Sequence, residues 1–157
     1  MENILASMNK FFLKVLKNIK LGKNVKISPF TNIYGCELKD NVFIGPFVEV
    51  QKNVTIGENS RIQSHSFICE GVDIGKNVFI GHNVNTINDN LPKVNNENWV
   101  VEKITIRDNV SIGTGSTIMG NVTIGENSII GANSLVTTDI PYNEVWVGSP
   151  AKFLRKI

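Results

Sequence analysis

The stretch Asn53-Val54-Thr55-Ile56-Gly57-Glu58-Asn59-Ser60-Arg61-Ile62 places one aliphatic residue, Ile62, six positions after another, Ile56. Ser60 follows Ile56 by four positions, so each hexad offers two side chains to one inner face. The same spacing extends along the chain, at Leu38, Ile44, Val50, Ile68, Ile74, Ile80 and Thr86, at Ile106, Ile112, Ile118, Ile124, Ile130 and Val136, and at Leu21, Ile27 and Ile33. A repeat of six residues predicts very short strands separated by regular corners.

The last residue of each corner is most often asparagine, as at Asn59, which tolerates the left-handed αL conformation. The others are Asn24, Asn41, Asn53, Asn77, Asn83, Asn109, Asn121, Asn127 and Asn133. Gly71 and Gly115 occupy the same place, as expected if the corner requires a positive φ. Strands this short cannot pair as hairpins, so we expect stacked coils of three strands and about 18 residues each. The predicted fold class is all-β, a parallel β-helix.

Three segments lie outside the repeat. Residues 1–20 carry apolar residues and lysines at helical spacing, which predicts an amphipathic helix. We expect this helix to cap the first coil, in preference to lying on a membrane. Residues 87–103 are polar and too long for a simple connection, so we expect a functional loop that projects outward. The expected organisation is a cap at 1–20, a β-helix at 21–150 with the extruded loop at about 87–103, and a short helical tail at 151–157.

Composition narrows the classes of partner. The formal net charge is only +2, which gives no sign of nucleic-acid binding, and no apolar run approaches the length of a membrane span. Cys36 and Cys69 match no metal-ligand spacing and are expected to be reduced thiols in the cytoplasm. The chain has two histidines, whereas the γ-class carbonic anhydrases that share such folds need three for zinc. We therefore expect no metal.

The coil before the extruded loop departs from the usual corner residues. His65 stands where asparagine is common; histidine is itself enriched in αL, so structural and catalytic roles both remain open. His82 takes an outward corner position where polar residues are ordinary, with a substrate contact as the alternative. Glu70 is either a solvated carboxylate or a ligand for an amine.

Ile56-Gly57-Glu58-Asn59-Ser60 and Ile124-Gly125-Glu126-Asn127-Ser128 resemble the signature of the hexapeptide-repeat acyltransferases. The resemblance covers about residues 21–150 and implies a left-handed coil, acetyl-CoA as co-substrate, and a homotrimer with active sites between subunits. Phe43 and Phe79, expected on one outer face, also suggest an interface. Within the family the chain most resembles nucleotide-linked amino-sugar N-acetyltransferases, through residues 68–72, 79–82 and 86–89 and through Pro92 and Trp99 of the loop. This implies a dTDP- or UDP-linked amino deoxysugar as acceptor, used for cell-surface polysaccharide, with Trp99 near the substrate.

The resemblance also implies where acetyl-CoA lies. Small residues match family positions that line the groove for the pantetheine arm, and basic residues match positions that face the phosphates. The groove residues are Gly113, Thr114, Gly131, Ala132 and Thr137, and the basic ones are Lys152 and Arg155. Thr138 departs from the family, where lysine is common.

The start of the loop lacks the histidine that related O-acetyltransferases carry there. An amine with a pKa near 8 is partly neutral and needs orientation more than deprotonation, whereas a hydroxyl needs a base. Asn88 and Asp89 are candidates to orient such an amine, and the N–H of Gly81 is a candidate donor to the oxyanion. The alternatives are an O-acetyltransferase that uses His65 or His82 as base, and a structural β-helix without catalysis.

Overall fold

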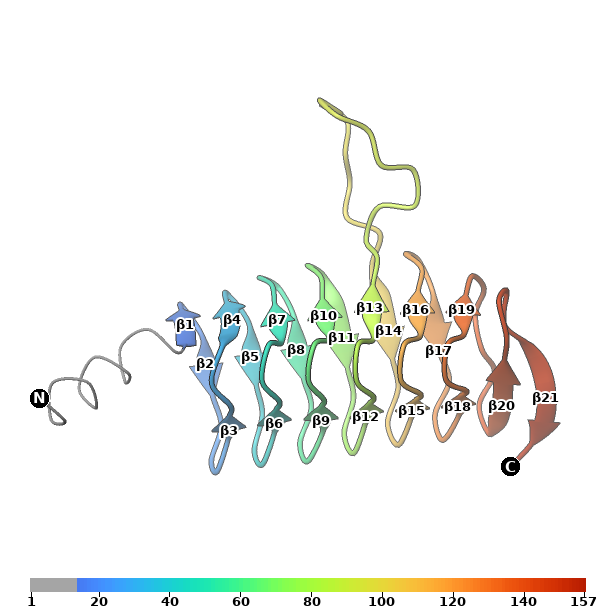
Figure 1. The fold of residues 1–157 in the computed structure, drawn as a ribbon, viewed down its shortest axis with the longest axis horizontal. Coiled ribbons are helices and arrows are strands. Elements are labelled where there is room, and N and C mark those ends of the chain that lie inside the picture. The colour runs from blue at the N-terminus through green and yellow to red at the C-terminus, as the bar shows by residue number, and fades with distance from the viewer. Residues whose placement is uncertain (1–13) are drawn as a thin grey trace, which may run out of the picture.

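The computed structural model describes residues 14–157, which wind into a parallel β-solenoid with one long excursion (Figure 1). Consecutive strands enter three different sheets in turn, and strands one coil apart pair in parallel. The sequence prediction of stacked three-strand coils is therefore confirmed.

Three sheets form the sides of the solenoid. Sheet 1 contains β1 (Lys14–Lys17), β4 (Thr31–Tyr34), β7 (Glu49–Val50), β10 (Phe67–Ile68), β13 (Asn85–Thr86), β16 (Thr117–Ile118) and β19 (Leu135–Val136). Sheet 2 contains β2 (Lys20–Leu21), β5 (Glu37–Leu38), β8 (Thr55–Ile56), β11 (Val72–Ile74), β14 (Ile104–Ile106) and β17 (Thr123–Ile124). Sheet 3 contains β3 (Lys26–Ile27), β6 (Phe43–Ile44), β9 (Arg61–Ile62), β12 (Phe79–Ile80), β15 (Ser111–Ile112), β18 (Ile129–Ile130), β20 (Glu144–Val147) and β21 (Lys152–Lys156).

Each edge between two sheets is a column of corners. The loop corner joins sheet 1 to sheet 2 and includes residues 51–53, 69–71, 87–103, 119–121 and 137–139. The ladder corner joins sheet 2 to sheet 3 and includes residues 57–59, 75–77, 107–109 and 125–127. The histidine corner joins sheet 3 to sheet 1 and includes residues 45–47, 63–65, 81–83, 113–115 and 131–133.

The six-residue spacing produces the core because every aliphatic residue of the repeat points inward. Leu38, Ile56 and Ile74 are in register in sheet 2 and are buried. Burying one such side chain contributes about 1.5–3 kcal/mol, so the stack of identical positions supplies most of the stabilisation. The second inward position holds valine or serine, as the sequence indicated.

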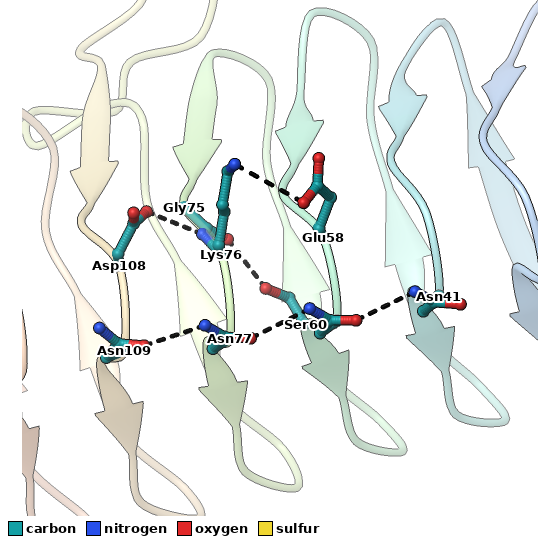
Figure 2. Close-up of polar contacts among 9 residues, drawn as sticks. Asn41, Glu58, Ser60, Gly75, Lys76, Asn77, Asp108 and Asn109 are labelled. Carbon is teal, nitrogen blue, oxygen red and sulfur yellow. Dashed lines mark hydrogen bonds and ion pairs between the residues drawn. The ribbon is translucent and has the colours of Figure 1, made fainter.

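The buried serines have a bonding role that their small size alone does not explain. The Oγ of Ser60 donates to the carbonyl of Gly75 at 2.8 Å (Figure 2) and accepts from the N–H of Val78 at 3.0 Å. At the next corner, the Oγ of Ser66 makes the same pair of bonds: it donates to the carbonyl of Gly81 and accepts from the N–H of Val84. A serine at this position therefore joins its own coil to the next one without leaving a buried polar atom unsatisfied.

Asparagines at the ladder corner form a continuous column of hydrogen bonds. The Nδ2 of Asn59 donates to Oδ1 of Asn77 at 3.2 Å, and Asn77 donates in turn to Asn109 at 3.1 Å (Figure 2). The column runs through Asn24, Asn41, Asn59, Asn77, Asn109, Asn127 and Asn143. All seven have a positive φ. Asparagine thus both adopts the corner conformation and links neighbouring coils.

Both ends of the chain correct the sequence prediction. Lys14–Lys17 and Lys20–Leu21 are strands of the first coil, so the expected helix at 1–20 does not extend over its last turns; its earlier part lies outside the described residues. The expected C-terminal helix is wrong, because Lys152–Lys156 forms β21, antiparallel to β20. Antiparallel pairing lets the last segment return along β20, where Phe153 packs edge-on against Trp146. The loop at 87–103 projects between β13 and β14, as predicted (Figure 1).

We predict that Asn77→Ala destabilises the protein by about 1–3 kcal/mol, because alanine loses both ladder bonds and strains the corner, where φ is 54°. Asn77→Gly is the matched control: it loses the same bonds but accepts the positive φ, so its cost is smaller. Urea unfolding followed by circular dichroism measures both. Equal stabilities for the two variants would show that the backbone conformation is not the limiting constraint.

Candidate functional site

The neck of the extruded loop brings together two of the residues singled out in the sequence. The Nδ2 of Asn88 donates to the backbone carbonyl of Glu70, one coil earlier, at 3.1 Å. A carbonyl can only accept, so this contact fixes which end of the Asn88 amide is nitrogen and leaves its Oδ1 as an available acceptor. Asn88 therefore lies beside Glu70 with one hydrogen-bond acceptor still to use.

The side chain of Glu70 is already engaged by neighbouring residues. Its carboxylate accepts from Nδ2 of Asn53 at 2.9 Å and lies 3.3 Å from Nζ of Lys52. Only 14% of the Glu70 side chain is exposed, and its N–H donates to Gln51 at 3.0 Å. These contacts hold Glu70 in the wall of the loop corner, and its role toward a substrate amine stays a prediction.

Asp89 and Trp99, predicted to act on the substrate, line the same groove. The groove has a volume of about 380 Å³, and its other walls include Glu102 and Asn121. Oδ1 of Asp89 accepts from the N–H of Leu91 at 3.1 Å, while 40% of the Trp99 side chain is exposed. An aromatic face beside a carboxylate suits a sugar ring that carries a positive charge.

The two histidines lie at a different corner from the loop. His65 has a positive φ, as the sequence predicted, and its ring stacks on Phe47 at 4.8 Å. Phe47 stacks on Phe30 at 5.1 Å, and both phenylalanines adopt αL although bulky residues rarely do. This aromatic column gives His65 a packing role that the sequence did not reveal. His82 is exposed in the next coil.

The histidine corner also contains four of the predicted acetyl-CoA residues. Gly113 and Thr114 lie one coil before Gly131 and Ala132, and a Cβ on Gly113 would press into the backbone of Ala132. Within residues 14–157 the N–H groups of His82, Thr114 and Ala132 have no hydrogen-bond acceptor. They form a column of free donors spaced about 4.8 Å apart, the separation of neighbouring strands.

The proposed role of Gly81 as oxyanion donor is wrong. Its N–H donates to the carbonyl of Ile112 at 2.8 Å as part of the coil-to-coil ladder. The first residue of every turn at the histidine corner is committed in this way, and the free donor there belongs to the middle residue, which is His82 in this coil. Spacing alone does not show which N–H of a corner points outward.

The remaining predicted residues are separated from this column. Thr137 is exposed at the loop corner, on the far side of sheet 1. Lys152 and Arg155 are exposed on β21 at the end of the solenoid. The chain therefore brings Asn88 to Glu70 and Asp89 to Trp99 near the loop neck, and gathers Gly113, Thr114, Gly131, Ala132 and the histidines at the histidine corner. Sheet 1 lies between the two groups.

Two residues at the loop neck were missed in the sequence. Asn90 and Glu102 bond to one another, and Asn90 also bonds to Gly120 in the coil that follows the loop. No signal could have found them, because Asn90 reads as one of several turn formers and Glu102 as one of several surface carboxylates.

The chain matches the family model described as bacterial transferase hexapeptide (six repeats) at residues 35–70, 53–88 and 103–138. The chain belongs to this family. A bifunctional protein GlmU from Thermosipho africanus is 37% identical over 134 residues, covering 85% of this hexapeptide protein and 28% of the relative. The mitochondrial gamma carbonic anhydrase 2 of Arabidopsis thaliana is 30% identical over 155 residues, covering 91% and 45%. This chain therefore spans less than half of either relative.

Solved structures give the same architecture. A hexapeptide transferase family protein from Anaplasma phagocytophilum is 24% identical with a TM-score of 0.77, over 94% of this chain and 86% of that one. AntD, an N-acyltransferase from Bacillus cereus solved as a point mutant with dTDP and coenzyme A, is 25% identical with a TM-score of 0.60, over 99% and 88%. The similarity to the Anaplasma phagocytophilum protein shows a shared fold and nothing about activity.

Residues 14–157 contain neither a metal-binding cluster nor a membrane-spanning helix. No three histidine, cysteine or acidic side chains there converge in the way that a metal ion would require. None of the described segments is a helix of the length and hydrophobicity needed to cross a membrane.

We predict that Cys36 and Cys69 do not react with a thiol reagent at pH 8 in the folded protein. Burial raises the pKa of Cys36 to about 11 and also raises that of Cys69, so at pH 8 both remain protonated, and the thiolate is the reactive form. Colour release with a disulfide reagent, before and after guanidinium unfolding, measures this. Rapid reaction of the native protein would show that the loop corner opens.

Proposed function

We propose that this protein transfers an acetyl group from acetyl-CoA to the amine of a dTDP- or UDP-linked amino deoxysugar, in the cytoplasm, for cell-surface polysaccharide. The observation that carries the proposal is the orientation of Asn88, whose Nδ2 is committed to Glu70 while its Oδ1 remains an acceptor beside Asp89. The likeness to AntD, an N-acyltransferase determined with dTDP and coenzyme A, supports the same class of substrate.

The loop neck offers acceptors to an amine but no histidine. Oδ1 of Asn88 can accept one N–H of the neutral amine, and the carboxylate of Asp89 attracts the ammonium form to the groove. After the ammonium form loses a proton to water, the hydrogen bond from the neutral amine to Asn88 directs the nitrogen lone pair outward from the loop. The N–C bond then forms at the thioester carbon, the C–S bond breaks, and the proton lost by nitrogen passes through water to the departing CoA thiolate. Orientation supplies most of the rate enhancement.

The histidine corner offers donors to acetyl-CoA. Gly113, Gly131 and Ala132 leave the backbone uncovered, so the free N–H groups of Thr114 and Ala132 can pair with carbonyls of the pantetheine arm. The free N–H of His82 replaces that of Gly81 as our candidate donor to the thioester oxygen. Lys152 and Arg155, exposed on β21, are candidates to bind the CoA phosphates.

The two groups of residues meet if subunits associate. Because sheet 1 separates the loop corner from the histidine corner, we propose a homotrimer in which the loop neck of one subunit faces the histidine corner of its neighbour. Phe43 and Phe79 support an interface: they share the outer face of sheet 3 in register with Arg61, whose guanidinium lies 4.7 Å from the Phe43 ring. The expected shared face of these phenylalanines is confirmed.

We expect free CoA to be released when acetyl-CoA is mixed with a nucleotide-linked amino sugar, and not with the matching hydroxyl sugar. The measurement is thiol release followed with a colorimetric reagent, over a panel of dTDP- and UDP-linked sugars; the buried cysteines contribute no background. Release only with hydroxyl acceptors would transfer the assignment to O-acetylation. No release with any acceptor and no CoA binding would favour a structural β-helix.

Asn88→Ala should lower kcat by about 100-fold, because the amine loses the acceptor that directs its lone pair. The KM for acetyl-CoA should change little, since the free donors lie at the other corner. Val94→Ala, at a loop position that is 91% exposed, is the control for changes to the loop itself. An Asn88→Ala enzyme with wild-type kcat would exclude the orienting role.

His65→Ala and His82→Ala should keep kcat within about threefold, because an amine that is partly neutral near pH 8 needs no histidine base. The rate should rise with pH as the amine loses its proton, so kcat/KM plotted against pH should level off above the pKa of the acceptor. An inflection near pH 6.5 that disappears in either variant would identify that histidine as the base and support the O-acetyltransferase alternative.

A further inference from the structure

The two limbs of the extruded loop are joined at its neck by a pair of hydrogen bonds. The N–H of Glu102, on the returning limb, donates to the carbonyl of Asn88 at 3.1 Å. The N–H of Asn90, on the outgoing limb, donates to Oε2 of Glu102 at 2.8 Å. Glu102 therefore holds the residues on both sides of Asp89, and its carboxylate acts as an acceptor within the fold.

Asn90 fastens the same neck to the coil that follows the loop. Its Nδ2 donates to the carbonyl of Gly120 at 3.1 Å, and its Oδ1 accepts from the N–H of Gly120 at 2.9 Å. The side-chain amide thus both donates to and accepts from the backbone of Gly120, as the backbone of a neighbouring strand would. A Cβ at Gly120 would lie 2.5 Å from both Cβ and Oε2 of Glu102, so only glycine leaves space for this contact.

Asn88 and Asp89 are consequently held between two coils. The Asn88 side chain is bonded to Glu70 in the preceding coil, and Asn90 is bonded to Gly120 in the following one. Residues 91–100, beyond this point, are all exposed. The part of the loop that is bonded to the solenoid is therefore the part that carries the two acceptors.

We propose that Asn90 and Glu102 are positioning residues, which fix the direction of the Asn88 and Asp89 acceptors through the hydrogen bonds of the loop neck. This inference rests on the proposed function, because direct attack by an amine depends on orientation. A displacement of about 1 Å in such a site can cost about 100-fold in rate. Glu102 acts through its hydrogen bond to the Asn90 N–H rather than through its charge.

The charge and the hydrogen bond of Glu102 are separated by Glu102→Gln and Glu102→Ala. Glutamine keeps an acceptor oxygen for the Asn90 N–H, so we expect its kcat within about threefold of wild type. Alanine removes the acceptor, and Asn90→Ala removes both bonds to Gly120, so each should lower kcat by about 10- to 100-fold with little change in the KM for acetyl-CoA. Hydrogen exchange at the Gly120 N–H should accelerate in Asn90→Ala, because its acceptor is gone.

Val94→Ala controls for general disturbance of the loop, and circular dichroism confirms the fold of every variant. An active wild type with unchanged kcat in Asn90→Ala and Glu102→Ala would overturn the positioning role alone. Equal losses in Glu102→Gln and Glu102→Ala would overturn it as well, since the charge would then be the essential feature. A wild type without acetyl transfer to any amine would overturn the proposed function and, with it, the positioning role.

Discussion

The structure depends on one backbone constraint, a residue in the αL conformation at the end of almost every three-residue corner. A corner that turns the chain within three residues requires a positive φ, which most side chains oppose at a cost of about 1–2 kcal/mol. Asparagine reduces that cost, and at the ladder corner its amide also bonds to the same residue one coil away, as in the pair Asn59 and Asn77. Once the corners are fixed, strands of two residues follow, and every sixth side chain points into the core.

The same geometry produces the surface that we propose binds acetyl-CoA. At the histidine corner, the N–H groups of the first and third residues bond neighbouring coils, as those of Gly81 and Asn83 do, while the N–H of the middle residue, such as His82, has no acceptor among the described residues. Stacking then repeats that free donor along the histidine corner. A binding surface for the amide groups of a long co-substrate can therefore arise from backbone alone, which explains why small residues at Gly113 and Gly131 suit this side of the solenoid.

The extruded loop solves a different problem, because the chemistry that we propose for it needs side chains at a definite angle. A loop of this length would ordinarily be mobile, yet its neck is bonded to the coil before it through Asn88 and to the coil after it through Asn90. Glu102 joins the outgoing and returning limbs of the loop at this neck. Acceptors held in this way suit an amine, whose reactivity depends on the direction of its lone pair, better than a hydroxyl, which would also need a base.

The sequence by itself determined the coil, its three strands per turn, the αL corners, including the one at His65, and the position of the loop, because each follows from local spacing and from backbone preferences of single residues. It did not determine the chain ends: β1 and β21 form because open sheet edges pair with neighbouring segments, and this overrides the helical pattern of lysines and apolar residues. It also missed the Phe30, Phe47 and His65 stack, the occupied N–H of Gly81, and the contacts of Asn90 and Glu102. These arise between residues that are distant in the chain and become neighbours only when the coils are stacked, so only the tertiary structure decided them.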